Sequence, residues 1–330
     1  MWFKKLTGFD EVSPEYVRNN ITIVGKNLTS KINNRSFQFG ELEIISLAQL
    51  RTQFLEKKFS CQLKLSEIVA NVQDLHCDPS NKNAFFQAAS EFNLLEMINP
   101  DVSPEKGIDM YERDFTQGPA CAITCGAGTI FRNYFAPING SIGQTSTNQI
   151  NCLEDIGKEL NNEEFLLWRM SNGYAFVNQK GILNINKQLS HLNRDKREFL
   201  KGKLKIGIQW NTEVTIANKN QIVSQVYCSA LPVAYSQIEF FYWESFARVI
   251  LEATYEATLY SAMLNLDKNK STKVFLTLVG GGAFGNEIEW ILESLIKVIK
   301  KFKNFPLDVK VVSYDISNAL LQKVIAEYNS

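Results

Sequence analysis

The sequence has little of what metal centres, disulfide scaffolds and nucleic-acid-binding proteins are built from. Its 330 residues include only two histidines, and the six cysteines are scattered without a Cys-x-x-Cys pair. We therefore expect no structural zinc site and reduced thiols. Basic and acidic residues are equal in number, 35 of each. Global charge thus indicates neither a nucleic-acid partner nor an anionic membrane surface.

Long apolar runs are also missing. No stretch is long enough to span a bilayer, and the N-terminus, Met-Trp-Phe-Lys-Lys-Leu-Thr-Gly, lacks the apolar core of a signal peptide. A soluble protein is expected. Hydrophobic content of 45% and aromatic content of 12% suffice for a sizeable core. This length allows one large domain or two ordinary ones.

A glycine-rich stretch near residue 280 is the most informative part of the chain. Residues 274–279 predict a buried strand, and apolar residues in 287–300 recur at helical spacing. Between them lies Gly280-Gly-Gly-Ala-Phe-Gly-Asn286. Such a loop lets backbone N–H groups and a helix N-terminus face an anion, usually a phosphate. The alternative is a tight turn without a ligand, because neither G-x-G-x-x-G nor a P-loop is matched.

Strands alternating with helices elsewhere in the chain predict an α/β fold, with a largely parallel or mixed sheet and helices on its faces. Residues 1–40 predict an arm with little regular structure, and 41–58 predict an amphipathic helix. Residues 120–200 predict a mainly helical region. Further strands are expected over 84–90, 174–177, 204–208, 221–231 and 309–313, and further helices over 148–160, 195–203, 244–264 and 319–328.

A long polar segment, 91–118, predicts an ordered loop. Loops of this length inside a compact domain are usually functional or disordered, and apolar residues such as Phe92, Leu95 and Tyr111 favour order. Thr116 or Gln117 is expected to cap a helix, which offers a second helix N-terminus to an anion. The loop carries seven acidic residues: Glu91, Glu96, Asp101, Glu105, Asp109, Glu112 and Asp114.

From residue 246 onward the chain resembles the C-terminal half of the macrodomain, the ADP-ribose-binding module. The shared order is a long helix, an apolar strand, Gly-Gly-Gly-Ala-Phe-Gly, a helix and Leu-Asp-Val-Lys-Val-Val-Ser-Tyr. Upstream, Phe86-Gln-Ala-Ala-Ser90 is similar to the family's Asn-Ala-Ala-Asn strand end, with Gln87 and Ser90 in place of both asparagines. Gln73-Asp74-Leu75 stands where the family has Gly-Asp-Ile.

A narrower resemblance covers residues 60–315. Phe-Gln-Ala-Ala-Ser-Glu-Phe-Asn-Leu-Leu-Glu, Asp-Phe-Thr-Gln-Gly-Pro-Ala-Cys-Ala, Arg-Asn-Tyr-Phe and Leu-Thr-Leu-Val-Gly-Gly-Gly-Ala-Phe-Gly-Asn look like an atypical macrodomain family. That family includes bacterial effector enzymes that remove mono-ADP-ribose from arginine side chains. The triple glycine lies in the second phosphate loop, so the glutamate pair of the poly-ADP-ribose glycohydrolases, with their Gly-Gly-Gly…Gln-Glu-Glu signature, is not carried over.

The resemblance implies a macrodomain-like domain over 61–330, with a mixed central sheet flanked by helices. An N-terminal extension, 1–60, precedes it, and a helical insertion at about 120–200 has no counterpart in a minimal macrodomain. The implied partner is the ADP-ribose moiety of a mono-ADP-ribosylated protein. The implied setting is that of a secreted effector acting inside a host cell.

The resemblance also implies a ligand site. Asp74 would read adenine, unless it serves ordinary turn chemistry. Phe284 would lie against the distal ribose, unless it is a core aromatic. Asn286 either binds ribose or caps the next helix, and Asn93 either orients ribose or forms an Asx turn. The full predicted ADP-ribose set is Asp74, Gln87, Ala88, Ser90, Asn93, Thr116, Gln117, Gly118, Gly280, Gly281, Gly282, Ala283, Phe284, Gly285 and Asn286.

Release of ADP-ribose breaks a bond at the anomeric carbon through an oxocarbenium-like transition state. One carboxylate can activate water there while an acid assists the leaving group. Within the acidic loop, Glu96, Asp109 and Asp114 are the candidates, each set against a solvated or capping role. No cluster with metal-ligand spacing appears, so we expect a hydrolase without metal or cofactor. The alternatives are a non-catalytic ADP-ribose-binding module and a hydrolase of a free ADP-ribose derivative.

Overall fold

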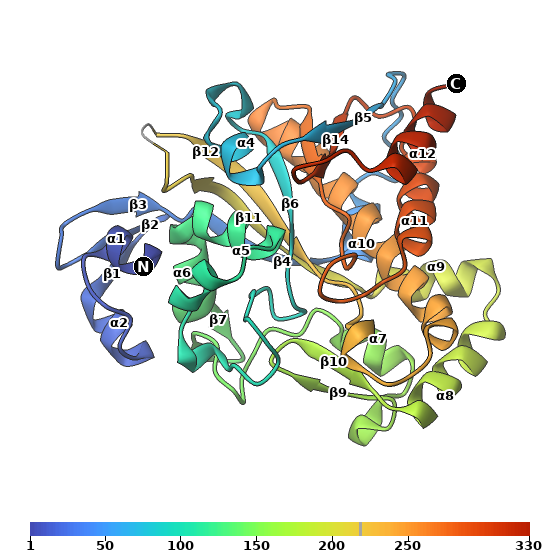
Figure 1. Ribbon diagram of the computed structural model, residues 1–330, viewed down its shortest axis with the longest axis horizontal. Helices are drawn as coiled ribbons and strands as arrows, with labels where there is room; N and C mark the ends of the chain where they lie inside the picture. The colour runs from blue at the N-terminus through green and yellow to red at the C-terminus, as the bar shows by residue number, and fades with distance from the viewer. Residues whose placement is uncertain (218–219) are drawn as a thin grey trace.

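The computed structural model describes residues 1–217 and 220–330 (Figure 1). At its centre lies a seven-stranded sheet with the order β4-β11-β12-β6-β13-β14-β5. β11 runs antiparallel to both of its neighbours, while β12, β6, β13, β14 and β5 pair in parallel. The strand bounds are β4 Glu41–Ser46, β5 Lys64–Val69, β6 Phe85–Ala89, β11 Lys205–Glu213, β12 Ile222–Cys228, β13 Lys273–Leu276 and β14 Asp308–Ser313.

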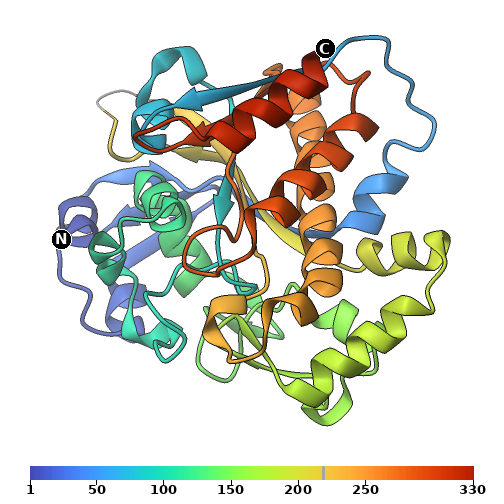
Figure 2. The same cartoon turned by 45° about the vertical axis from the view of Figure 1, so that its right-hand side comes forward.

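Helices cover both faces of this sheet. Gln87 on β6 points to one face, where its side-chain amide donates to Thr258 of α10. Its neighbour Phe86 points to the other face and stacks on His76 of α4. The predicted α/β class, a mixed sheet flanked by helices, is therefore confirmed (Figures 1 and 2). The helix bounds are α3 Leu47–Thr52, α4 Val72–Cys77, α5 Gln117–Thr124, α6 Gly126–Tyr134, α10 Phe240–Asn269, α11 Ile288–Lys301 and α12 Ala319–Asn329.

The first 40 residues are more ordered than the sequence pattern predicted. They form two helices and a small three-stranded sheet, and Trp2, Phe3 and Val17 are buried in a second apolar core. The elements are too short for their periodicity to be recognised, and much of this core comes from residues 95–134. The bounds are α1 Trp2–Thr7, α2 Pro14–Asn20, β1 Ile21–Val24, β2 Asn27–Ser30 and β3 Ser36–Gln38.

The helix predicted over 41–58 is wrong in its first part. Residues 41–46 form β4, the edge strand beside β11, and the helix starts only at Leu47. Ser46 and Gln49 form a capping box, which fixes that start. The boundary predicted at residue 60 stays a prediction.

Residues 120–200 are less helical than predicted. Two hairpins interrupt the helices, and the helix predicted over 148–160 is limited to α7. The strand predicted at 174–177 is confirmed as β10, and the helix predicted at 195–203 as α9. The remaining bounds here are β7 Pro137–Ile138, β8 Ser141–Ile142, α7 Glu154–Glu159, β9 Trp168–Ser171, β10 Tyr174–Val177, α8 Gln179–Ser190 and α9 Arg194–Gly202.

The acidic loop is ordered, as predicted, and contains two short 3-10 helices, η2 Pro104–Lys106 and η3 Asp109–Arg113. Other 3-10 turns are η1 Pro79–Asn81, η4 Glu163–Phe165 and η5 Val233–Tyr235. The segments that follow β5, β6, β13 and β14 all leave the same edge of the sheet, because these strands are parallel. Ligand sites of open α/β sheets lie at this carboxyl edge.

Candidate active site

Two adjoining cavities lie at the carboxyl edge of the sheet. The larger one has a volume of about 1080 Å³, within the range of sites for nucleotide-sized ligands. The smaller one, about 190 Å³, has room for only part of such a ligand. Both are lined by Asp114, Thr116, Gln117, Thr277, Leu278 and Gly282, so these residues form the junction between them.

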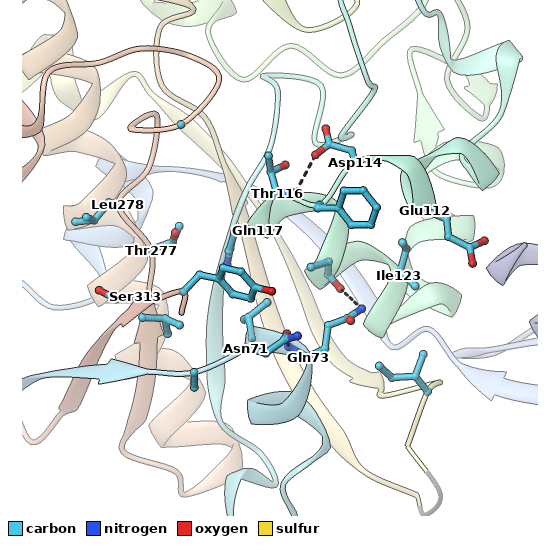
Figure 3. A pocket seen from close by; sticks show the side chains of 18 of the residues that line it. Asn71, Gln73, Glu112, Asp114, Thr116, Gln117, Ile123, Thr277, Leu278 and Ser313 are labelled. Atoms are coloured by element: carbon cyan, nitrogen blue, oxygen red, sulfur yellow. Dashed lines mark hydrogen bonds between the residues drawn. The ribbon is translucent and has the colours of Figure 1, made fainter. Parts of the chain in front are cut away.

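Six separate parts of the chain line the larger cavity, one of them Thr215 and Ile216. Asn71 and Gln73 follow β5, and Ser313 ends β14. Thr277 and Leu278 lie on the far side of Thr116 and Gln117 from Glu112 and Ile123 (Figure 3). The N-terminal extension contributes Trp2, Lys5, Leu6 and Arg35. Two aromatic side chains of the lining, Phe115 and Tyr314, are 95% and 74% exposed and so present open ring faces.

The glycine loop is built as the sequence predicted, between β13 and α11. Gly280 has φ of +81°, and a Cβ there would lie 2.5 Å from the Cβ of Ala230. Asn286 is buried, and its side-chain amide donates to the carbonyls of Leu231 and Gly280, so it pins the loop. The loop residues that reach the cavities are Gly280, Gly281, Gly282, Ala283 and Phe284.

The N-terminus of α5 meets the end of β6 at the junction. Gln117 accepts the N–H of Ala89 and donates to the carbonyl of Gln87, which ties the helix start to the strand end. A Cβ on Gly118 would lie 2.1 Å from the carbonyl oxygen of Ala89, so only glycine allows this approach. Thr116 is the N-cap residue, but its side chain makes no capping bond.

Glu96 is a buried carboxyl group without a hydrogen-bond partner. Its side chain lines the smaller cavity and is 3% exposed, and both oxygens lack a partner among the described residues. The nearest cation is Arg132, whose Nη2 lies 4.0 Å from Oε2. Burial raises the pKa of Glu96 to about 8, with Arg132 opposing the shift and Asp114 adding to it. Glu96 therefore holds a proton at neutral pH.

Asp114 and Glu91 complete the carboxyl groups at this place. Asp114 lines both cavities and accepts the N–H of Thr116 at 2.8 Å. Glu91 lines the smaller cavity and accepts from the hydroxyl of Tyr174 at 3.1 Å and from the N–H of Met97 at 3.3 Å. Burial, and then the charge of Glu96, raises the pKa of Glu91 well above its usual value.

An aromatic cluster closes the smaller cavity. Phe284 lies 5.3 Å from Tyr174 and 5.9 Å from Tyr235, measured between ring centroids. All three rings line the cavity. Phe284 thus packs against the core and also lines the smaller cavity. Its contact with the distal ribose stays a prediction. Tyr174 and Tyr235 could not be found from the sequence, because only the fold brings β10 and η5 to the glycine loop.

Several predicted site residues lie outside both cavities. Gln87 and Ala88 are buried within the sheet, and Asn93 is buried beneath the insertion, where it donates to Gln149. Asp74 faces neither cavity, although its neighbours Asn71, Val72 and Gln73 line the larger one. Asp109 accepts the N–H of Phe3 at 3.4 Å. The predicted residues that the structure brings together are Ser90, Glu96, Asp114, Thr116, Gln117, Gly118 and residues 280–284.

Within residues 1–217 and 220–330, no three His, Cys, Asp or Glu side chains are placed to share a metal ion. In the same ranges, no helix combines the length and apolar character needed to cross a membrane. Cys121 and Cys125 both lie in the core.

Comparison with known proteins gives structural similarities only. No protein family and no curated protein sequence matches the chain. The chain is similar to the poly(ADP-ribose) glycohydrolase of Thermomonospora curvata, with 8% identity over 95% of both chains and a TM-score of 0.46. It is also similar to the poly(ADP-ribose) glycohydrolase of Deinococcus radiodurans in complex with ADP-ribose, with 10% identity, 87% and 93% coverage and a TM-score of 0.45. Likenesses this distant assign neither a family nor an activity to the chain.

Proposed function

We propose that the protein binds the ADP-ribose moiety of a mono-ADP-ribosylated protein and releases it by hydrolysis. The carrying observation is the meeting, around the smaller cavity, of a glycine loop, a helix N-terminus and two carboxyl groups of different burial. Glu96 is buried and unpartnered among the described residues, and Asp114 is half-buried and open to both cavities. A pair of carboxyl groups beside one ligand site is typical of enzymes that cleave glycosidic bonds.

Binding in this proposal uses both cavities. The adenosine part would occupy the larger cavity, where the exposed rings of Phe115 and Tyr314 offer faces for a planar base. The diphosphate would lie at the junction, between the backbone N–H group of Gly282 and the first turn of α5. The distal ribose would enter the smaller cavity, beside Phe284 and the carboxyl groups.

The proposed chemistry gives one role to each of these two carboxyl groups. Asp114 takes a proton from a water molecule whose oxygen bonds to the anomeric carbon. The bond from that carbon to the protein nitrogen breaks, and Glu96 gives its proton to the departing nitrogen. The buried Glu91 carboxyl lies beside the same sugar and is the third group available there. Water attack with acid assistance suits an oxocarbenium-like transition state.

The narrow sequence resemblance favours an arginine linkage. A departing guanidine gains the proton that Glu96 holds and leaves as a guanidinium. The setting of a secreted effector inside a host cell rests on that resemblance alone and stays a prediction.

The test is release of free ADP-ribose from proteins modified at arginine, serine or glutamate. We expect release from the arginine linkage to be fastest. Tight binding of ADP-ribose without release from any linkage would establish a binding module instead. Turnover of free ADP-ribose derivatives with no release from protein would establish a hydrolase of free ADP-ribose derivatives.

A further inference from the structure

The first 40 residues of the N-terminal extension, 1–60, lie directly against the acidic loop (Figures 1 and 2). The two share one apolar core, in which Trp2 and Phe3 are buried together with Leu95, Ile108 and Tyr111. Polar contacts also join them, and these concentrate on residues 108–112.

Glu11 makes two of these contacts and a third to α6. Its Oε2 accepts the backbone N–H of Ile108 at 2.8 Å and that of Asp109 at 2.7 Å. Its Oε1 accepts the hydroxyl of Tyr134, at the end of α6, at 2.6 Å. Gly107 adapts to this arrangement, since a Cβ there would lie 2.3 Å from Oε2 and its φ is +92°.

The same peptide segment is held from its other side. Trp2 donates its indole N–H to the carbonyl of Ile108 at 3.2 Å, and its backbone N–H donates to Glu112 at 2.9 Å. The start of η3 is therefore fixed by the extension as well as by its own turn, in which the N–H of Tyr111 donates to Ile108.

From η3 the contacts lead to the candidate acid. Tyr111 lies in η3 with its side chain fully buried, and its hydroxyl accepts the backbone N–H of Glu96 at 3.0 Å. Asp114 directly follows η3, and its own N–H donates to the carbonyl of Tyr111. One 3-10 turn thus sets the place of both Glu96 and Asp114.

We propose that Glu11 is a positioning residue for catalysis, which acts through η3 to hold Glu96 and Asp114 at the smaller cavity, which both of them line. This inference rests on the proposed function. Glu11 lines neither cavity, so it has no direct part in ligand binding or bond breaking. The N-terminal extension therefore helps to position the residues of the active site.

Two substitutions and one control test this. Glu11→Ala removes all three acceptor contacts. Glu11→Gln keeps them in a neutral form, because one amide oxygen can accept both N–H groups while the amide nitrogen donates to Tyr134. Burial raises the pKa of Glu11 to about 7, so a neutral side chain suits this place. Val17→Ala shrinks a fully buried side chain of the extension without touching η3, and controls for general loosening.

We expect Glu11→Ala to lower kcat for ADP-ribose release at least tenfold while the Kd for ADP-ribose changes less than threefold. Glu11→Gln should restore kcat to within threefold of wild type, and Val17→Ala should stay within threefold. Retention of kcat in Glu11→Ala, or an equal loss in Val17→Ala, would overturn the proposal.

Amide hydrogen exchange supplies a readout that needs no enzymatic activity. In Glu11→Ala, peptides covering 94–97 and 107–113 should exchange at least tenfold faster, while Glu11→Gln should match the wild type. If wild-type protein releases no ADP-ribose, the proposed function falls. The exchange comparison then decides separately whether Glu11 holds the loop, and unchanged exchange in Glu11→Ala would refute it.

Discussion

Two loops form the walls of the site, the glycine loop and the acidic loop, and they are held in place in different ways. The glycine loop, 280–286, is fixed largely by its own residues: the N–H of Asn286 donates to Gly280, and that of Gly285 donates to Gly282. Two contacts, with Leu231 and Ala234, join it to the rest of the chain. The acidic loop, 91–118, depends on distant segments. Glu11 holds its 3-10 turn, Arg132 donates to Leu94, and Tyr174 donates to Glu91.

This difference in anchoring gives the two loops separate roles, one in ligand binding and one in the chemical step. A locally fixed loop with open backbone N–H groups suits the constant part of the ligand, its diphosphate. A loop assembled from remote contacts can bury carboxyl groups and so move their pKa values away from those in water. Changes in the glycine wall should therefore alter binding, and changes in the acidic wall should alter the chemical step.

The largest loss of rate should come from replacing Asp114 or Glu96, the two candidate catalytic carboxyl groups of the smaller cavity. Asp114→Asn and Glu96→Gln should each lower the rate of ADP-ribose release by about 10²–10⁴-fold, the usual contribution of general acid–base catalysis. Single-turnover rates on an arginine-modified protein measure this, and calorimetric titration with ADP-ribose gives the affinity. If the variants lost affinity for ADP-ribose instead of rate, these carboxyl groups would serve in ligand binding. The proposed difference between the glycine loop and the acidic loop would then be wrong.

Burial of Glu96 should cost stability in a defined pH window. Its folded pKa of about 8 lies above the unfolded value of 4.5, so the folded protein holds the extra proton between these values. Stability from this group is present below pH 4.5 and is lost as pH rises towards 8.

Glu96→Gln removes that dependence. At pH 8 the variant should be more stable than wild type by on the order of a few kcal/mol, with the advantage shrinking towards pH 4.5. Urea unfolding at a series of pH values measures this. A constant difference across the series would show that Glu96 does not titrate as its burial requires.

Two glycines of the same loop, Gly280 and Gly282, test whether the shape of the glycine loop controls binding. At Gly280 an added Cβ meets Ala230 and the backbone has positive φ, whereas at Gly282 nothing lies within 4 Å of the added atom. Gly280→Ala should weaken ADP-ribose binding by about 10–100-fold, from roughly 1–3 kcal/mol of strain. Gly282→Ala should change the Kd much less. Equal effects would mean that the loop's shape does not control binding.

The smallest effect is expected for Asp109, an acidic-loop residue that lines neither cavity. Asp109→Asn should leave the rate of release within threefold of wild type, because an amide oxygen can still accept the N–H of Phe3. Measuring the release rates of Asp109→Asn and Asp114→Asn together distinguishes two aspartates that the sequence alone could not tell apart. A hundredfold loss at Asp109 would move the chemistry away from the junction.

Local patterns accounted for much of the fold. The apolar spacing of 244–264 and 287–300 predicted α10 and α11, and the glycines between residues 280 and 285 predicted the loop in its correct place. Short elements were not recognisable in this way. Residues 1–40 form helices and strands because their apolar side chains pack against residues 95–134, and this contact leaves no periodic mark in the sequence.

The acids could be predicted only as a group. Seven acidic residues in one loop look alike in sequence, and burial, which distinguishes them, comes from distant residues. Glu91 became a candidate only because Tyr174 of β10 reaches it, and Asp109 lost its place because α1 covers it. Gln87 and Asn93 resembled ligand-binding positions but proved to be internal hydrogen-bonding groups.

The division between the two walls can be tested by measuring, on the same two variants, the Kd for ADP-ribose and the single-turnover rate of release at saturating substrate. We expect that Gly280→Ala loses affinity but keeps the rate within about fivefold, and that Asp114→Asn loses at least about a hundredfold in rate but keeps its affinity. A full rate in Asp114→Asn, or a parallel loss of both quantities in both variants, would contradict this division.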